Sequence, residues 1–171
     1  MITKSQLIKK LNDSRITFQL HEHEALFTVK DSENKRGGIE GIHTKNLFLK
    51  NKKKKYFLFS CEENQSVDIK KLSKSLALGN LSFAKEAALK EYLNITPGSV
   101  TPFGLLNDIE NKVNFFLDNN LTQDDKINFH PLENTATITM QIKDFINFLL
   151  ENKKKVNIFD FKSYTLKNKK T

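Results

Sequence analysis

Residues 97–108 read PGSVTPFGLLND, with two prolines and two glycines around the hydroxyl residues Ser99 and Thr101. Glycine lets a backbone approach a ligand closely, and proline stiffens a turn and removes a donor. Such a loop can hold backbone N–H groups in a fixed array that receives a carbonyl oxygen or an oxyanion. Ordinary connecting loops show the same spacing. Other segments of the chain are therefore needed to tell a functional loop from a connecting one.

Two further segments carry polar residues beside apolar strand patterns. Residues 44–51 read TKNLFLKN, and Lys45 enters an otherwise apolar run. A lysine there must reach water, a carboxylate or an anionic ligand, although it can also simply snorkel into solvent. Residues 129–140 read FHPLENTATITM. His130 precedes Pro131, which favours an extended backbone, and it can act as a general base or position a substrate.

Together the three segments resemble the YbaK/aminoacyl-tRNA-editing family, from about residue 3 to residue 150. Within it they are most similar to the free-standing prolyl-tRNA editing branch (ProX type), whose members hydrolyse alanine wrongly attached to proline tRNA. The related cysteinyl-type editors usually carry a GGCSP-like loop, whereas this loop reads GSVTPFG. The resemblance therefore implies a cytoplasmic deacylase of mischarged alanyl-tRNA(Pro), without a cofactor, whose partner is tRNA. Whether it also docks on prolyl-tRNA synthetase stays open.

The resemblance also implies roles for single residues. Lys45 would contact the terminal phosphate or ribose of the tRNA acceptor end, and Asn46 would hydrogen-bond the amino acid or ribose. His130 matches a histidine that lines the aminoacyl pocket, and Asn134 would bind the ester or the free amino group. His43 occupies a position that is often basic, and a neutral imidazole would weaken a charge contact there.

These considerations predict two sets of site residues and a set of pocket walls. The catalytic set is Lys45, Gly98, Ser99, Val100, Thr101 and Pro102. The substrate-binding set is Asn46, Leu47, Phe103, Gly104, His130 and Asn134. The expected apolar walls, chosen for their nearness to the motifs, are Ile39, Leu47, Val100 and Phe103.

The expected chemistry needs no nucleophilic side chain. An aminoacyl-tRNA ester is already activated, so the enzyme must hold the carbonyl, admit a water and stabilise the oxyanion. Backbone N–H groups of residues 98–102 would do the last, at about 3 kcal/mol per well-aimed donor, while the neighbouring ribose hydroxyl orients the water. No Ser–His–Asp or Cys–His set can be assembled, and His21 and His23 lack a third ligand, so no metal site is expected.

Composition and charge bound the class of protein. The 171 residues suit one domain, no run of 18 apolar residues predicts a membrane span, and the single Cys61 agrees with a reducing compartment. The net charge of +8 is concentrated in lysine clusters at residues 50–55, 153–155 and 162–170. Such clusters attract polyanions, or they are merely well solvated. The expected tRNA contacts are Lys45, Lys50, Lys52 and Lys53.

The pattern predicts an α+β or mixed α/β domain, with a central, mostly antiparallel, partly barrel-like sheet surrounded by helices, as in YbaK proteins. Helices are expected after a Thr3–Gln6 capping box, over 29–35, after Asp68, after Ser82 and over 142–150. Strands are expected over residues 16–21 (with Leu20 inward), 46–50, 56–61, 113–117, 126–130, 136–140 and, at the sheet edge, 156–161. The editing domain would span residues 1–161, and residues 162–171 would form a loose basic tail.

Three other functions remain open from sequence. Cysteinyl-tRNA(Pro) deacylation is the nearest, within the same family. A non-catalytic tRNA-binding or regulatory module would have no need of the constrained glycine loop. A general basic RNA-binding protein would leave both that loop and residues 130–134 unexplained.

Overall fold

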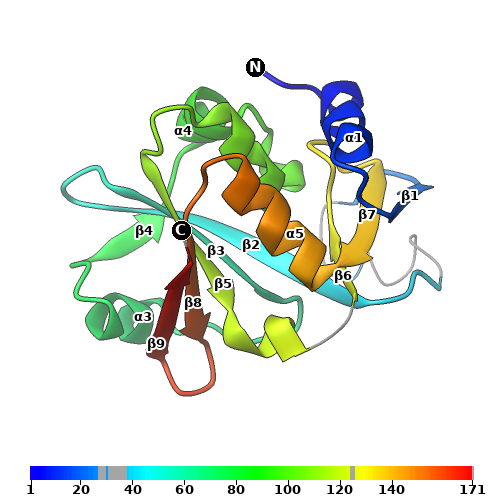
Figure 1. Ribbon diagram of the computed structural model, residues 1–171. Helices are drawn as coiled ribbons and strands as arrows, with labels where there is room; N and C mark the ends of the chain where they lie inside the picture. The colour runs from blue at the N-terminus through cyan, green and yellow to red at the C-terminus, as the bar shows by residue number, and fades with distance from the viewer. Residues whose placement is uncertain (27–29, 31–37, 124–125, 171) are drawn as a thin grey trace.

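A computed structural model of the chain describes residues 1–26, 30, 38–123 and 126–170. Among these residues, nine strands form one mixed sheet in the order β1-β7-β6-β2-β3-β5-β8-β9, with β4 paired to β2 off this path (Figure 1). The strands are β1 (Phe18–Glu22), β2 (Ile42–Asn51), β3 (Tyr56–Glu62), β4 (Leu81–Phe83), β5 (Val113–Asp118), β6 (Lys126–Phe129), β7 (Ala136–Gln141), β8 (Val156–Asp160) and β9 (Thr165–Lys170). Five of the described strand pairs are antiparallel and three are parallel, which confirms the expected mixed architecture.

Helices and short helical turns surround this sheet. The α-helices are α1 (Lys4–Asp13), α3 (Ile69–Ser75), α4 (Glu86–Ala88) and α5 (Ile142–Glu151). A π-helical turn, η1 (Leu89–Leu93), continues α4, and three 3-10 turns follow: η2 (Pro97–Ser99), η3 (Pro102–Asn107) and η4 (Asn119–Gln123). The glycine loop of the sequence is thus two 3-10 turns joined at residues 100–101. No helix in the described part of the chain is long and apolar enough to cross a membrane.

Strand β2 is the longest strand, and its second edge is interrupted. One edge pairs with β3 from Thr44 to Lys50. The other edge pairs with β6 only at Ile42 and His43, and with β4 only at residues 49–51. Phe48 O then accepts a hydrogen bond from Ala84 N at 2.9 Å. Among the described residues, 44–47 therefore have a partner strand on one side only, and this gap in the sheet positions the site described below.

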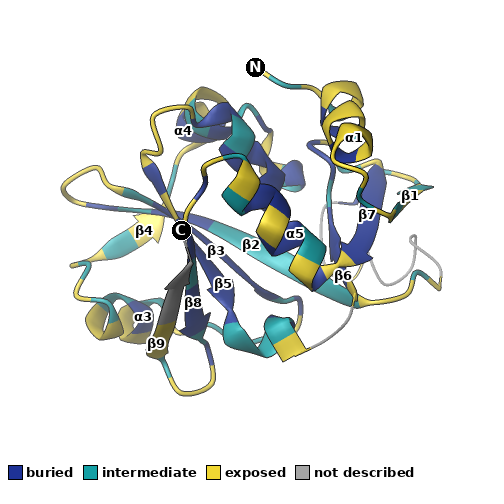
Figure 2. Cartoon of the chain, in the orientation of Figure 1, coloured by how far each residue is buried: buried dark blue, intermediate teal, exposed yellow. Residues whose placement is uncertain are grey.

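Two apolar clusters cover the two faces of the sheet; leucine is the commonest residue in the larger one, and phenylalanine in the smaller one. The larger one lies under α1, α4 and α5, where Phe103 contacts the rings of Phe129, Phe145 and Phe148 edge-on. The smaller one contains Leu72 of α3 with rings from β3, β5 and β8. Figure 2 shows these central strands as buried.

Several local expectations are confirmed by the hydrogen bonds. Thr3 Oγ1 accepts from Gln6 N, and Thr3 N donates to Gln6 Oε1 at 2.8 Å, which completes the capping box of α1. The Asp68 carboxylate accepts from Lys71 N and caps α3. The strands of the central sheet and α5 lie where they were predicted within a few residues.

Two expectations near short elements are wrong. Ser82 does not cap a helix, because it lies in β4, where it pairs with Lys50; α4 begins after Lys85 without a side-chain cap. Leu20 does not point inward: it is 37% exposed, because β1 is an edge strand with β7 as its one partner strand. The helix expected over residues 29–35 lies outside the described residues.

The basic tail is not loose, and β8 is not at the sheet edge. Strand β9 pairs with β8 in antiparallel fashion from Thr165 to Lys170. Tyr164 holds the turn between them, because its N–H donates to Asp160 O at 2.7 Å and its hydroxyl accepts from Asp68 N at 2.8 Å. Its ring packs edge-on against Phe159 and at a steep angle against Phe161, so one aromatic side chain anchors a strand whose own composition is polar.

Gly104 is required by close packing in η3. A Cβ at this position would lie 2.9 Å from Leu93 Cβ and 3.2 Å from Leu93 O. We expect Gly104→Ala to lower the free energy of unfolding by about 1–3 kcal/mol, because backbone must move to admit the methyl group. Urea denaturation measures this loss. Gly38→Ala is the matched control, since no atom lies within 4 Å of its added Cβ; equal losses in the two variants would contradict the packing argument.

Candidate active site

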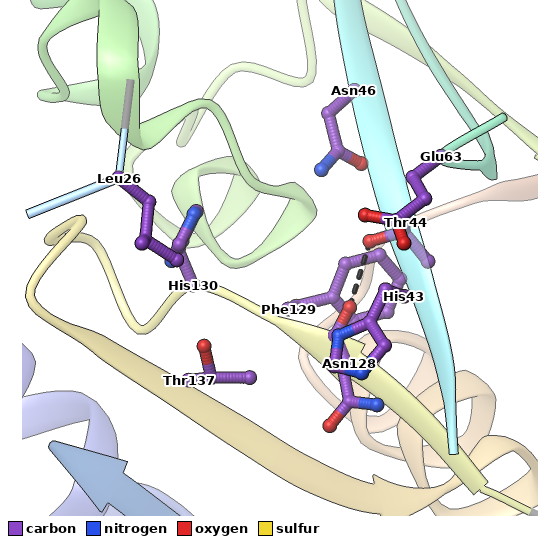
Figure 3. A pocket seen from close by; sticks show the side chains of 9 residues that line it. All are labelled: Leu26, His43, Thr44, Asn46, Glu63, Asn128, Phe129, His130 and Thr137. Atoms are coloured by element: carbon purple, nitrogen blue, oxygen red, sulfur yellow. Dashed lines mark hydrogen bonds between the residues drawn. The ribbon is translucent and has the colours of Figure 1, made fainter. Parts of the chain in front are cut away.

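A small polar pocket lies beside the gap in β2. Its described lining residues come from β2, β6, β7 and the segments next to them: Leu26, His43, Thr44, Asn46, Glu63, Asn128, Phe129, His130 and Thr137. Figure 3 shows Asn46, Thr44 and Glu63 on one side and Leu26, His130 and Thr137 on the other. The cavity volume is about 30 Å³, which is room for about one water molecule. Seven of these nine residues are polar, so the pocket suits a small polar group.

The floor of the pocket is held rigidly by side-chain bonds between β2, β6 and β7. Thr44 Oγ1 donates to Asn128 O at 2.7 Å, as the dashed line in Figure 3 marks. The amide of Asn128 donates to Glu40 O at 2.7 Å and accepts from the hydroxyl of Thr139. Because these polar groups are satisfied by one another, Thr44 and Asn128 hold the strands together at the pocket and leave the chemistry to its other residues.

Asn46 joins the pocket to the glycine loop. Its Nδ2 donates to Val100 O at 3.1 Å, and its Oδ1 accepts from the hydroxyl of Ser60 on β3. One side chain thus fixes the position of the loop relative to the strand gap. Asn46 is half-buried, and an amide that bonds on both sides in this way is costly to remove, because its partners lose their hydrogen bonds as well.

The loop itself uses some of its backbone donors internally. Ser99 N donates to Thr96 O at 3.0 Å, and Pro102 has no N–H to offer. Because Thr101 is fully buried, this leaves within residues 98–102 at most the N–H groups of Gly98 and Val100 for a ligand. The array of oxyanion donors expected from sequence is therefore narrower than the whole loop.

His130 follows β6 directly and offers one free nitrogen to the pocket. Its Nδ1 lies 2.8 Å from Ala136 O, so Nδ1 carries the proton and donates. Burial lowers the pKa of His130, and the nearby His23 ring adds to this effect, while the bond to Ala136 O opposes it. The ring is therefore neutral at pH 7, and its Nε2 has a lone pair without a partner among the described residues.

A second histidine supports the pocket from behind. His23 Nε2 lies 2.8 Å from Thr137 Oγ1, and its Nδ1 lies 2.8 Å from Glu24 O. The His23 ring stands edge-on to His130 with 6.3 Å between the ring centroids. His23 thus orients the hydroxyl of Thr137.

Comparison with known proteins supplies the family. A model described as the aminoacyl-tRNA editing domain matches residues 23–148, a span that contains the glycine loop and every described residue that lines the pocket. The chain belongs to the aminoacyl-tRNA editing domain family.

Named relatives agree with this family. The chain is 34% identical over 155 residues to the prolyl-tRNA editing protein ProX of Acetoanaerobium sticklandii, covering 89% of this chain and 93% of that protein. It is 36% identical over 151 residues to the prolyl-tRNA synthetase associated domain-containing protein 1 of Bos taurus, covering 85% and 88%. A solved structure of a protein proposed as a trans-editing enzyme for prolyl tRNA synthetase shares the fold, with a TM-score of 0.66, 19% identity and coverage of 98% and 99%.

In this editing domain, two predicted substrate residues line the pocket, namely Asn46 and His130. Residues 98–102 do not line it, and they reach it through the bond from Asn46 to Val100. Asn134 stands behind it: its Nδ2 donates to Leu26 O at 3.2 Å, and Leu26 N donates to Asn134 O at the same distance. Asn134 therefore holds the lining residue Leu26 in place.

Lys45 lies next to the pocket but on the other face of β2. Side chains alternate along a strand, and Lys45 pairs in register with Cys61, while its neighbours Thr44 and Asn46 line the pocket. Burial raises the pKa of Cys61 to about 12, and the charge of Lys45 offsets only part of this effect. The thiol is therefore protonated and is no nucleophile.

Most of the other predicted residues lie in the core or far from the pocket, and Ile39 lies beside it. Leu47 packs against the smaller apolar cluster, and Phe103 and Gly104 are buried in η3. Ile39 contributes its carbonyl oxygen, which lies 3.2 Å from His43 Nε2. The lysines Lys50, Lys52 and Lys53 lie at the end of β2 remote from the pocket and in the turn after it.

Sequence reasoning missed Thr44, Glu63, Asn128 and Thr137. Glu63 is 9% exposed and follows β3, and its N–H donates to His43 O at 2.9 Å. Thr137 lies on the strand β7 that pairs with β6. Thr44 and Thr137 lie within the motifs at residues 44–51 and 129–140, but only the strand pairings that join distant segments bring these positions together in the pocket.

Proposed function

We propose that the chain is a trans-editing hydrolase that removes alanine from mischarged alanyl-tRNA(Pro). The observation that carries this proposal is the bond from Asn46 to Val100, which joins a small polar pocket to a loop of backbone donors. The family of the chain and the roles of its named relatives support an aminoacyl ester as the substrate. The methyl side chain of the amino acid would then enter the pocket, and the loop would face the ester.

The size of the pocket favours alanine over proline. A cavity of about 30 Å³ admits a group about as large as one water molecule, and the methyl of alanine is close to that size. The proline ring adds methylene groups that would overlap the walls, and a rigid wall excludes by overlap more strongly than a roomy pocket discriminates. The bonds of Thr44 and Asn128 supply that rigidity.

The charge of the pocket suits the α-ammonium group of the amino acid. Among the described lining residues, Glu63 is the one carboxylate, and a carboxylate forms charge-assisted hydrogen bonds with an ammonium group. We expect Glu63→Gln to raise KM for alanyl-tRNA by roughly 10-fold, in line with about 1.5–3 kcal/mol for a hydrogen bond to a charged group. Steady-state kinetics of deacylation measure this change, and a KM unchanged within twofold would contradict the assignment.

The chemical step follows from these positions. The ester carbonyl oxygen would accept from the remaining N–H groups of Gly98 and Val100. A water, oriented by the ribose hydroxyl and by His130 Nε2, attacks the carbonyl carbon. The carbon–oxygen bond to the ribose breaks, and the ribose oxygen takes up the proton that the water gives. The products are free alanine and intact tRNA.

The tRNA contacts remain a prediction from the resemblance. Lys45 would bind the terminal phosphate or ribose, and its position beside the pocket fits a contact to the nucleotide more than one to the amino acid. The lysines Lys50, Lys52 and Lys53 would act on the acceptor stem. Docking on prolyl-tRNA synthetase is a separate question, which a pull-down with the purified synthetase would answer.

The proposal is tested by deacylation of alanyl-, cysteinyl- and prolyl-esters, all on proline tRNA, by the wild type and by Lys45→Ala. We expect rapid loss of alanine alone, and a slower rate in the variant, whose melting temperature serves as the folding control. Preferential loss of cysteine would instead establish the cysteinyl branch. If no ester is cleaved faster than in buffer, the hydrolase proposal is wrong and a binding role replaces it.

A further inference from the structure

We infer that a belt of six exposed lysines, at the end of the sheet remote from the pocket, binds the phosphate backbone of the base-paired stem of the tRNA. The belt consists of Lys52, Lys53, Lys55, Lys70, Lys74 and Lys155. This inference rests on the proposed function, since the stem would be that of the edited tRNA. It extends the expected tRNA contacts from one hairpin turn to a surface built by three separate segments of the chain.

The topology of the sheet gathers these lysines. Strands β3, β5 and β8 run parallel to one another, so all three begin at the same end of the sheet. Each of them begins directly after a lysine, namely Lys55, Lys112 and Lys155. Lys112 pairs with Glu110, so it does not count toward the belt. Figure 1 shows the β2–β3 turn at the left and β6 and β7 at the right, on opposite sides of the sheet.

Three adjoining grooves connect the belt. The first, of about 450 Å³, is lined by residues that include Lys52, Lys53 and Lys55. It shares Asn114 with a groove of about 420 Å³ that contains Lys155. It shares Asn80 with a third groove, of about 560 Å³, that contains Lys70 and Lys74. The shared residues make the three grooves neighbours, and together they form a trough that wraps around this end of the sheet. Phe57 and Phe116 of the first groove belong to the smaller apolar cluster, whereas Phe115 of the Lys155 groove belongs to the larger one on the other face.

The charge of the trough is uncompensated. None of the six lysines forms a salt bridge with a residue that the structure describes, whereas Lys4, Lys9 and Lys126 elsewhere do. Among the described lining residues of the three grooves, Glu110 is the one acidic side chain, and it is paired. Lys154 also lines the trough, but it is buried and donates to Asp108 O at 2.7 Å, so it supports the fold.

The chemistry of the trough favours a phosphate backbone over a protein partner. Apart from the lysines, its described polar lining side chains are mostly amides, and the rest of the lining is largely apolar. The amides are Asn51, Asn80, Asn111, Asn114 and Asn157. Protein interfaces depend on tryptophan, tyrosine and arginine anchors, and the described lining residues of the trough include none. Lysine and asparagine contacts to phosphate position a nucleic acid without reading its sequence.

The distance between the pocket and the lysine belt fits binding to the base-paired stem of a tRNA. Asn46 and Lys52 are six residues apart along β2 and the turn after it, which is about 20 Å of extended chain. An aminoacyl group sits at the end of an unpaired strand that leads into a base-paired stem. With the amino acid in the pocket, a backbone contact about 20 Å away falls on the stem, beyond the unpaired end.

The test is binding of an RNA duplex that lacks any aminoacyl end, measured by fluorescence anisotropy over a range of salt concentrations. A duplex cannot use the aminoacyl pocket, so its binding reports on the belt even if the hydrolase proposal fails. We expect Lys52→Gln/Lys53→Gln/Lys55→Gln to weaken binding and to reduce the slope of log K against log salt by about 2–3, since each phosphate contact contributes about 0.7–0.9.

The matched control removes three exposed lysines from α1 and α5, as Lys9→Gln/Lys10→Gln/Lys143→Gln. It makes the same change in net charge, and we expect it to leave the slope unchanged. Thermal melting checks that both variants fold. Equal slopes in the belt variant and the wild type, or equal reductions in the two variants, would overturn the belt, because binding would then be absent from this surface or due to diffuse charge.

Discussion

Replacing Asn46 with alanine is expected to lower kcat/KM for deacylation of alanyl-tRNA(Pro) by roughly 100-fold. The amide of Asn46 bonds both Val100 O and the hydroxyl of Ser60. Its removal leaves two partners without hydrogen bonds and frees the loop from the strand. A loss of about 2.7 kcal/mol corresponds to 100-fold, and small displacements of positioning groups have effects of that size.

A second variant separates the loss of the hydrogen bond from Asn46 to Val100 O from the loss of side-chain volume. Asn46→Asp keeps the size of the side chain and an acceptor for the Ser60 hydroxyl, but its carboxylate cannot donate to Val100 O. We therefore expect a loss similar to that of the alanine variant. Asn147→Ala is the matched control, because Asn147 is exposed on α5. Single-turnover rates with saturating enzyme measure these differences, and a decrease of less than threefold in Asn46→Asp would contradict the role assigned to the donor.

The sequence predicts the centre of this fold well, for a physical reason. Strands β3 and β5, and the Leu47–Leu49 part of β2, are short apolar and aromatic runs that begin directly after a lysine or an asparagine, and such runs are typical of buried strands or short helices. The same pattern is missing from β4, which has only three residues, and from β9, which is polar. These two strands depend on pairing with β2 and β8 and on the anchor Tyr164, which are contacts that a local pattern does not contain.

The sequence likewise predicts some residues of the candidate site and misses others. Motifs lead to Asn46 and His130, because both stand beside recognisable turns or strand ends. Strand alternation already implies that Lys45 and Asn46 point to opposite faces, but only the structure shows which face carries the pocket. Thr44 and Asn128 meet because β2 pairs in parallel with β6. Such a pairing joins segments 84 residues apart, and its register cannot be deduced from either segment alone.

Replacing His130 with alanine is expected to lower kcat for deacylation by roughly 100-fold, the lower part of the range for groups that assist proton transfer. Its Nδ1 is engaged by Ala136 O at 2.8 Å, so only Nε2 can accept a hydrogen bond from the attacking water. His130→Asn keeps a donor for Ala136 O but has no basic nitrogen. Recovery of more than a third of the wild-type rate by the asparagine variant would show that His130 serves only to hold the loop.

The pH profile distinguishes these roles further. Burial lowers the pKa of His130 below its ordinary value, so the neutral ring persists as the pH falls through 6.5. We expect kcat in the wild type to stay level there and then to fall tenfold per pH unit once the imidazole is protonated, because the cation has no lone pair for the water. The alanine variant should lack this acid limb. The α-amino group of the substrate titrates at higher pH, near 7.7–8.0 in model peptides, so the two limbs are separable. A wild-type acid limb centred above pH 6.5 would contradict the assignment, since burial lowers a histidine pKa.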